Sequence, residues 1–246
     1  MNILVISASY PPDHSGGYGI RVKDIIDGLT ARGHDVRVLT TIRTKKFKVD
    51  SQSPPYPILR KLHNRYDAKF FPREVLFDLL DINFVHKQIK AFNPDVIYLG
   101  HIYILSKALI PYLAESGIPI VLDEGGASLK GAWIERGRWF RFVGDYGEKN
   151  VLIRTIKPLI IDSVCKISRG RIHKTWQWPE HMRFFINSRH NLEQLREMGL
   201  PLDNATVIHS GIDLEKFAFV PRERINQPIS ILCPGRLEAR KGVMDS

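Results

Sequence analysis

Short apolar runs alternate regularly with amphipathic segments along this chain, and this pattern constrains the fold more than any other feature. Residues 2–8 form an apolar run, and residues 19–33 place apolar side chains at helical spacing before Gly33, a residue type that commonly ends helices. Further runs predict strands at 34–41, 95–100, 118–124, 182–188 and 205–211, and helices at 73–93, 104–117, 150–169 and 189–199. Such alternation is typical of an α/β fold with an open, mostly parallel, doubly wound sheet that carries helices on both faces.

A polar stretch near the end of the chain predicts a domain boundary. Residues 221–228 are charged and bracketed by prolines, and the apolar run 229–235 begins a new strand. We therefore expect one doubly wound domain over residues 1–222. Residues 223–246 would then hold a linker and the first strand and turn of a second domain.

The charge of the chain is strongly positive. Lys and Arg number 36 against 26 Asp and Glu, giving a net charge of +10, and basic residues are concentrated at 43–48, 136–141 and 166–176. An anionic membrane surface, a phosphorylated substrate or nucleic acid would each suit this charge. We expect no nucleic-acid partner, because the sequence contains no zinc finger, RNP-type motif or helix-turn-helix.

The sequence predicts neither export nor insertion into a membrane. No apolar run approaches the roughly 18 residues of a membrane span, and the N-terminus lacks the basic region of a signal peptide. Cys165 and Cys233 lie far apart without metal-ligand spacing, as is usual in a reduced, cytosolic protein. We expect a cytoplasmic protein that can lie peripherally at the inner face of the membrane.

The loop after the first predicted strand is glycine-rich, and ligands of doubly wound sheets bind beyond the carboxyl ends of the strands. Gly16 and Gly17 would let the backbone approach an anion near the start of a helix. A dinucleotide fingerprint is not favoured, because the glycines lie about ten residues after the strand. The second strand also ends in Thr40 and Thr41, without the acidic residue that would hold a ribose. Anion contact and a plain turn remain the two alternatives.

Other polar residues also follow predicted strands. His101 and the pair Asp123 and Glu124 are candidate ligands or acid/base groups, with helix capping or solvation as the alternative. Arg236 and Lys241, after the run 229–235, would place two cations near a helix N-terminus, where they suit a phosphate. Solvated cations in a turn are the alternative there.

Several segments, in this order, resemble retaining glycosyltransferases of the GT-B fold, in particular the large family 4. They are "ILVISASYPPDHSGG", "LTARGHDVRVLT", "NPDVIYLGH", "FFINS", "LPLDNATVIHSGIDLEKF" and "ILCPGRLEARKG". The resemblance extends from the first residue to the last. It implies an N-terminal Rossmann-like domain on the acceptor side, with a truncated second Rossmann-like domain for the donor.

The resemblance also implies a reaction. A sugar would be transferred from a nucleotide-diphosphate donor to a glycan, lipid-linked or other acceptor, with retention of the anomeric configuration and without a cofactor or metal ion. Negative charge would build on the diphosphate as the glycosidic bond breaks, so cations there would stabilise the transition state. The residues that carry these roles would be Gly16, Gly17, Arg236 and Lys241 for the donor diphosphate, and His101 and Glu124 for catalysis.

The sequence departs from the family pattern in places. Many relatives have His within the strand where this chain has Tyr98 and Gly100, and a His-Asp pair at the positions of Asp123 and Glu124. The family's second acidic motif should lie beyond Ser246, so we expect an incomplete fragment that is inactive alone. The alternatives are another enzyme with paired Rossmann-like domains, such as a nucleotide-sugar epimerase, or a non-catalytic acceptor-binding or membrane-docking module.

Overall fold

The computed structural model describes residues 1–12, 17–42, 54–125, 128–134, 137–144, 151–176 and 181–221. The chain divides into two compact units, Met1–Ser210 and Gly211–Ser246. In the second unit, the Asp213 carboxylate accepts hydrogen bonds from the amides of Glu215 and Lys216 at 3.0 and 3.2 Å, which forms a turn. The boundary expected at residue 222 stays a prediction, and the linker and strand predicted at 223–246 lie outside the described residues.

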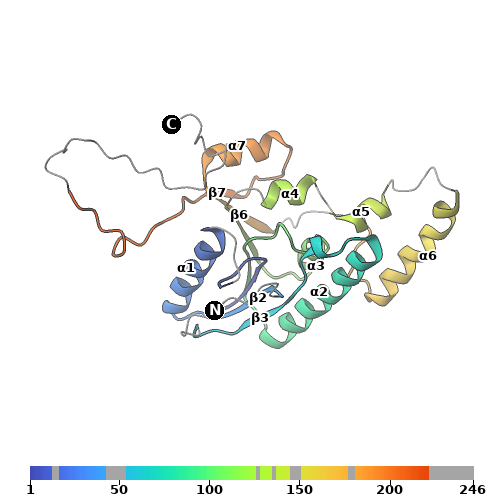
Figure 1. Ribbon diagram of the computed structural model, residues 1–246, viewed down its shortest axis with the longest axis horizontal. Helices are drawn as coiled ribbons and strands as arrows, with labels where there is room; N and C mark the ends of the chain where they lie inside the picture. Colours follow the sequence, from blue (N-terminus) through green and yellow to red (C-terminus); the bar gives the residue numbers. More distant parts are fainter. Residues whose placement is uncertain are drawn as a thin grey trace. The chain divides into compact units, whose positions relative to one another are not determined.

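A seven-stranded parallel sheet forms the centre of the first unit (Figure 1). Its strands are β1 (Asn2–Ser7), β2 (Asp35–Thr41), β3 (Ile58–Leu62), β4 (Val96–Leu99), β5 (Ile120–Glu124), β6 (Met182–Ile186) and β7 (Ala205–Val207). Their order is β3-β2-β1-β4-β5-β6-β7, and every neighbouring pair is parallel. The predicted doubly wound α/β fold is therefore confirmed. The chain reverses its direction of travel across the sheet between β1 and β4, which makes this the topological switch point.

The helices connect these strands. They are α1 (Gly17–Ala31), the 3-10 helix η1 (Arg65–Asp67), α2 (Phe71–Phe92), α3 (Leu109–Ala114), α4 (Ser128–Ile134), α5 (Arg138–Val143), α6 (Val151–Ile167) and α7 (Arg189–Glu197). Asn93 ends α2 in the left-handed conformation, with φ 46°. Ser188 caps α7 by accepting a hydrogen bond from the amide of Asn191 at 3.1 Å. Both boundaries are the ones that the sequence predicts.

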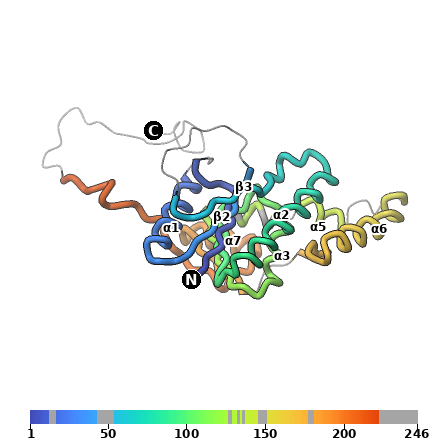
Figure 2. Tube along the Cα trace, turned by 90° about the horizontal axis from the view of Figure 1, so that it is seen from below, coloured from blue at the N-terminus to red at the C-terminus, as the bar shows by residue number. Residues whose placement is uncertain are grey.

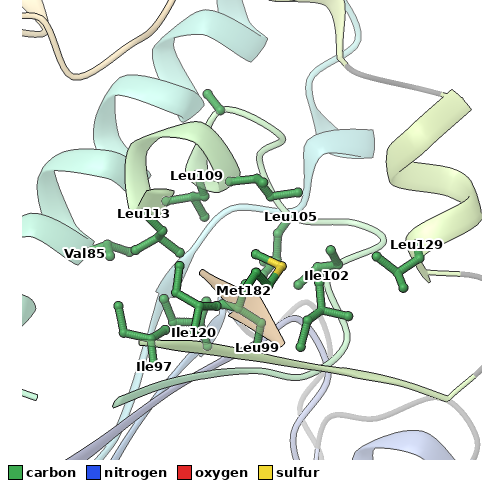
Figure 3. Packing of buried hydrophobic residues seen from close by; sticks show 14 of the residues in the cluster. Val85, Ile97, Leu99, Ile102, Leu105, Leu109, Leu113, Ile120, Leu129 and Met182 are labelled. Carbon is green, nitrogen blue, oxygen red and sulfur yellow. The ribbon is translucent and has the colours of Figure 1, made fainter. Parts of the chain in front are cut away.

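The larger hydrophobic core lies on one face of the sheet. Alternate strand residues such as Ile97, Leu99 and Ile120 point toward helices α2 and α3, where Val85 and Leu113 meet them (Figure 3). Helices α5 and α7 contribute to the same core. On the opposite face, α1 covers β1 and β2, and Figures 1 and 2 both show the strands between α1 and the helices α2 and α3. This two-sided cover is typical of a buried parallel sheet.

Some predicted boundaries differ from the structure. The helix predicted at 104–117 is shorter, because the residues before Leu109 form turns in which the buried Lys107 ammonium donates to the carbonyls of Ile102 and Tyr103 at 2.9 and 2.8 Å. Strand β3, and helices α4 and α5, are present in addition to the predicted elements. In the described ranges, no helix combines the length and apolar character that a bilayer span requires.

Candidate functional site

The loops after β1 and β4 contact each other at the switch point. The Ala8 amide donates to the His101 carbonyl at 2.7 Å, and the His101 amide donates to Ser7 Oγ at 3.2 Å. A Cβ atom on Gly100 would lie 2.9 Å from Ser7 Oγ, closer than real Cβ atoms approach, and 3.1 Å from Val22 Cγ2, which is also a tight contact. Glycine is therefore needed at position 100 for this contact, which fixes the position of His101.

His101 lies between two tyrosine rings at the carboxyl edge of the sheet. Its ring centroid is 5.3 Å from that of Tyr18, in the first turn of α1, and 6.4 Å from that of Tyr103, in its own loop. His101 Nδ1 is buried and has no hydrogen-bond partner within the described part of the chain. Burial, and to a lesser degree the positive charge of Lys107, lowers the pKa of His101. The imidazole is therefore neutral at neutral pH, so it can accept a proton or a hydrogen bond from a bound group.

Asp123 holds three elements together beneath Tyr18. Arg21 Nη2 of α1 donates to Asp123 Oδ1 at 2.6 Å, and the Tyr98 hydroxyl of β4 donates to Asp123 Oδ2 at 2.6 Å. The Tyr18 hydroxyl donates to the Asp123 backbone carbonyl. Burial raises the pKa of Asp123, although the Tyr98 hydrogen bond and the Arg21 charge both oppose this shift. Because both carboxylate oxygens are bonded, Asp123 positions α1 and Tyr18 relative to the strands.

Glu124 points to the other face of β5, since successive strand residues alternate in direction. The residue is fully buried, and its Oε2 accepts a hydrogen bond from the Leu129 amide at 2.5 Å. This contact satisfies an amide in the first turn of α4. The structure therefore places Glu124 in a helix-capping position, and its catalytic role stays a prediction.

The structure describes only some of the other predicted site residues. Gly17 is the exposed first residue of α1, where a Cβ atom would meet nothing within 4 Å. Gly17 and His101 come after β1 and β4, and Glu124 is the last residue of β5. These strands are neighbours in the sheet, so the structure brings the three residues to one edge. Gly16, Arg236 and Lys241 lie outside the described residues.

A series of aromatic rings extends from this edge. After Tyr18, His101 and Tyr103, the next ring is Tyr66 of η1, whose centroid is 5.9 Å from that of Tyr103. Tyr66 is 51% exposed, and Arg65 Cζ lies 4.9 Å from the centroid of its ring. We call Tyr18, His101, Tyr103 and Tyr66 the aromatic series. Sequence reasoning missed its three tyrosines. The available signal for Tyr18 and Tyr103 was that each follows a predicted strand, and Tyr66 had no such signal because it follows β3.

Tyr18 and Tyr103 each lie against a glycine. A Cβ atom on Gly125, after β5, would overlap the Tyr18 ring, and a Cβ atom on Gly131 of α4 would overlap the Tyr103 ring. Among the described residues, no three His, Cys, Asp or Glu side chains are grouped as metal ligands would be. The site is thus built from aromatic rings, a neutral imidazole and backbone amides.

Comparison with known proteins agrees with this architecture. Residues 15–141, more than half of the chain, match the family described as Glycosyltransferase Family 4. The glycogen synthases of two Mycobacterium tuberculosis strains, CDC 1551 / Oshkosh and H37Rv, are each 26% identical over 265 residues, covering 100% of this chain and 56% of the relative. The chain thus spans about half the length of the curated relatives it matches.

A solved structure agrees in fold. Sucrose-phosphate synthase from Thermosynechococcus elongatus has a TM-score of 0.51 and 12% identity, over 87% of this chain and 49% of that protein. The predicted Rossmann-like architecture is confirmed by this likeness and by the order of the seven strands. With its family match, its parallel sheet and its site at the switch point, the chain belongs to Glycosyltransferase Family 4.

Proposed function

We propose that this chain forms the acceptor side of a retaining glycosyltransferase that takes a sugar from a nucleotide-diphosphate donor. The observation that carries the proposal is the neutral His101 between Tyr18 and Tyr103 at the carboxyl edge of the sheet. A neutral imidazole can accept a proton from an attacking hydroxyl or orient a hydroxyl of the donor sugar. Family membership favours this function over a nucleotide-sugar epimerase.

The acceptor is proposed to be a glycan or a lipid-linked sugar. Sugar rings present C–H groups on their faces, and these pack against aromatic side chains such as those of the aromatic series. Tyr66 and Tyr103 offer partly exposed rings for this purpose. One relative is named for the synthesis of glycogen, which is a glucan.

The donor is proposed to bind through its diphosphate. The backbone of Gly16 and Gly17 and the start of α1 would approach the phosphates, since helix N-termini favour anions. Arg236 and Lys241 would neutralise the charge on the leaving group, so the proposal requires no metal ion or cofactor. Glu124 keeps its capping contact in this scheme, and any further contribution to the reaction would come through α4.

The chain is also proposed to need a donor-binding partner domain for turnover, since it spans about half of its curated relatives. Positioning both substrates accounts for a large share of catalysis, so the acceptor side alone is expected to bind without transferring sugar. A non-catalytic acceptor-binding module would behave in the same way. A cytoplasmic location peripheral to an anionic membrane is also proposed, and the net charge of +10 supports the membrane part of this proposal.

Saturation-transfer NMR on the 246-residue chain tests the acceptor site. A panel of oligosaccharides that includes maltoheptaose is expected to give signals that weaken in Tyr66→Ala and Tyr103→Ala and persist in the ring-preserving Tyr66→Phe. Failure of every oligosaccharide to give such signals would refute the acceptor assignment. A parallel assay with radiolabelled nucleotide sugars tests turnover, and measured transfer by this chain would overturn the proposed need for a partner domain.

A further inference from the structure

Helix α6 has apolar side chains on the face that packs against the core and also on a neighbouring, exposed face. Val164 is buried, and Ile153, Ile160 and Ile161 are partly buried against the larger hydrophobic core. The second apolar face is exposed to solvent and consists of Leu152, Ile156, Leu159 and Ile167, with exposed fractions between 40% and 69%.

The four exposed side chains form one stripe along the helix. Leu152, Ile156 and Leu159 are spaced by four and then three residues, and Ile167 follows eight residues later. At 3.6 residues per turn these positions lie on the same side of a helix. Isolated exposed apolar residues are ordinary, but a continuous exposed stripe indicates a contact surface. We call these four residues the outer stripe of α6.

The surroundings of the outer stripe are cationic. Residues 151–176 contain six Lys and Arg against a single acidic residue, Asp162, which pairs with Lys174 at 3.2 Å. Arg154, Lys166 and Arg169 are exposed, and Lys166 flanks the outer stripe by its helical position. The outer stripe suits an apolar layer, and the unbalanced positive charge around it suits anionic groups at the boundary of that layer. A second copy of the same chain would instead bring like charges together.

The segment that follows α6 is bonded to the rest of the first unit. Just after α6, Arg171 donates to Asn83 Oδ1 of α2 at 2.8 Å. The Trp139 indole of α5 donates to the His173 carbonyl at 2.7 Å. Figures 1 and 2 both show α6 at the periphery, beside α5 and away from α1. The outer stripe can therefore contact a flat surface without disturbing the core.

We propose that α6 docks this protein on an anionic lipid bilayer, and this inference rests on the proposed peripheral membrane location. The outer stripe enters the boundary between headgroups and acyl chains, while Lys166 beside it and Arg169 just after the helix contact lipid phosphates. This is the arrangement of an interfacial amphipathic helix. Such docking would hold the acceptor side of the enzyme near lipid-linked sugars.

Vesicle cosedimentation of the 246-residue chain tests the proposal. The chain is expected to bind vesicles that contain phosphatidylglycerol more strongly than vesicles of phosphatidylcholine alone. Replacing Leu152, Ile156 and Leu159 together by Ser is expected to weaken this binding at least about tenfold. The matched control is Leu76→Ser with Leu80→Ser on α2, which are similarly exposed and are expected to change binding less than about twofold.

The possible results distinguish the proposed membrane location of the chain from the proposed role of α6. No binding of the wild-type chain to either vesicle would overturn both the peripheral location and the role of α6. Binding to anionic vesicles that the triple substitution leaves unchanged would overturn the role of α6 alone. Equal binding to both vesicles would overturn the role of the cations. If the triple variant fails to fold by circular dichroism, the single exposed substitution Leu159→Glu replaces it, with the same expected loss.

Discussion

Replacing Arg21 by Met is expected to destabilise the first unit by about 3 kcal/mol, because it leaves the buried carboxylate of Asp123 without its cation. The Asp123 side chain is 2% exposed, and Arg21 Nη2 lies 2.6 Å from its Oδ1. Removing one partner of a buried pair costs about 3–5 kcal/mol, and the lower end applies because the Tyr98 hydroxyl still donates to Oδ2. The Arg21 side chain is 18% exposed, so water also reaches part of this pair.

A double-mutant cycle isolates the interaction between the two charges. Asp123→Leu is expected to cost about 2 kcal/mol, less than Arg21→Met, since the freed guanidinium can reach water. The double variant is expected to cost no more than about 2 kcal/mol, because two apolar side chains can pack where the ion pair was. The coupling energy between Arg21 and Asp123 is then about 3 kcal/mol.

The same cycle makes a prediction about pH. Arg21 lowers the pKa of Asp123 against the stronger effect of burial, so Arg21→Met raises this pKa further. When folding raises the pKa of a carboxyl, the folded state binds more protons than the unfolded state at pH values between the two pKa values. The free energy of unfolding therefore falls as pH rises through that range. The free-energy gap between wild type and Arg21→Met should therefore widen as pH rises and narrow in acid.

Urea unfolding of the four proteins, followed by the fluorescence of tryptophans that include the buried Trp139, measures both quantities. A coupling energy below about 0.5 kcal/mol, or a gap between wild type and Arg21→Met that does not change with pH, would refute the reasoning.

Three further predictions concern stability. Burial raises the pKa of Asp78 well above its ordinary value, so stability should fall as pH rises above that value, and Asp78→Asn should flatten the dependence in urea titrations at several pH values. Ser188→Ala should cost about 1 kcal/mol by removing the cap of α7, and Ser188→Asp should restore most of it in the same assay. Gly100→Ala should cost about 1–3 kcal/mol by overpacking against Ser7, whereas Gly28→Ala within α1 should be neutral or stabilising, and equal melting temperatures for the two variants would contradict this account.

Most of the sheet could be predicted from the sequence, because strands buried on both faces carry continuous apolar runs that few other elements share. Strand β3 could not, since it pairs only with β2 at the edge of the sheet and carries Arg60 and Lys61. The position of β3 in the sheet depends on its pairing with β2, and the residue pattern of the strand alone does not encode this pairing. Helices α4 and α5, with seven and six residues, are too short for their periodicity to be distinctive.

The position of the candidate site could be predicted from the sequence, but several of the side chains that form it could not. His101 could be identified because it follows β4, and ligands of such sheets bind beyond strand ends. The orientation of Glu124 follows from alternation along β5, but only after the face bearing Asp123 is known. The contact between Tyr66 and Tyr103 joins residues from different loops, and no local pattern connects them.

The glycines under the tyrosine rings have a consequence for how this site can vary. Gly125 and Gly131 shape the surface through the side chains that they lack, because any Cβ atom would push Tyr18 or Tyr103 out of place. A substitution at either glycine therefore acts as a mutation of the neighbouring ring, although it changes no group that would touch a sugar. We therefore expect that graded additions of volume at positions 125 and 131 change the acceptor preference from beneath the site.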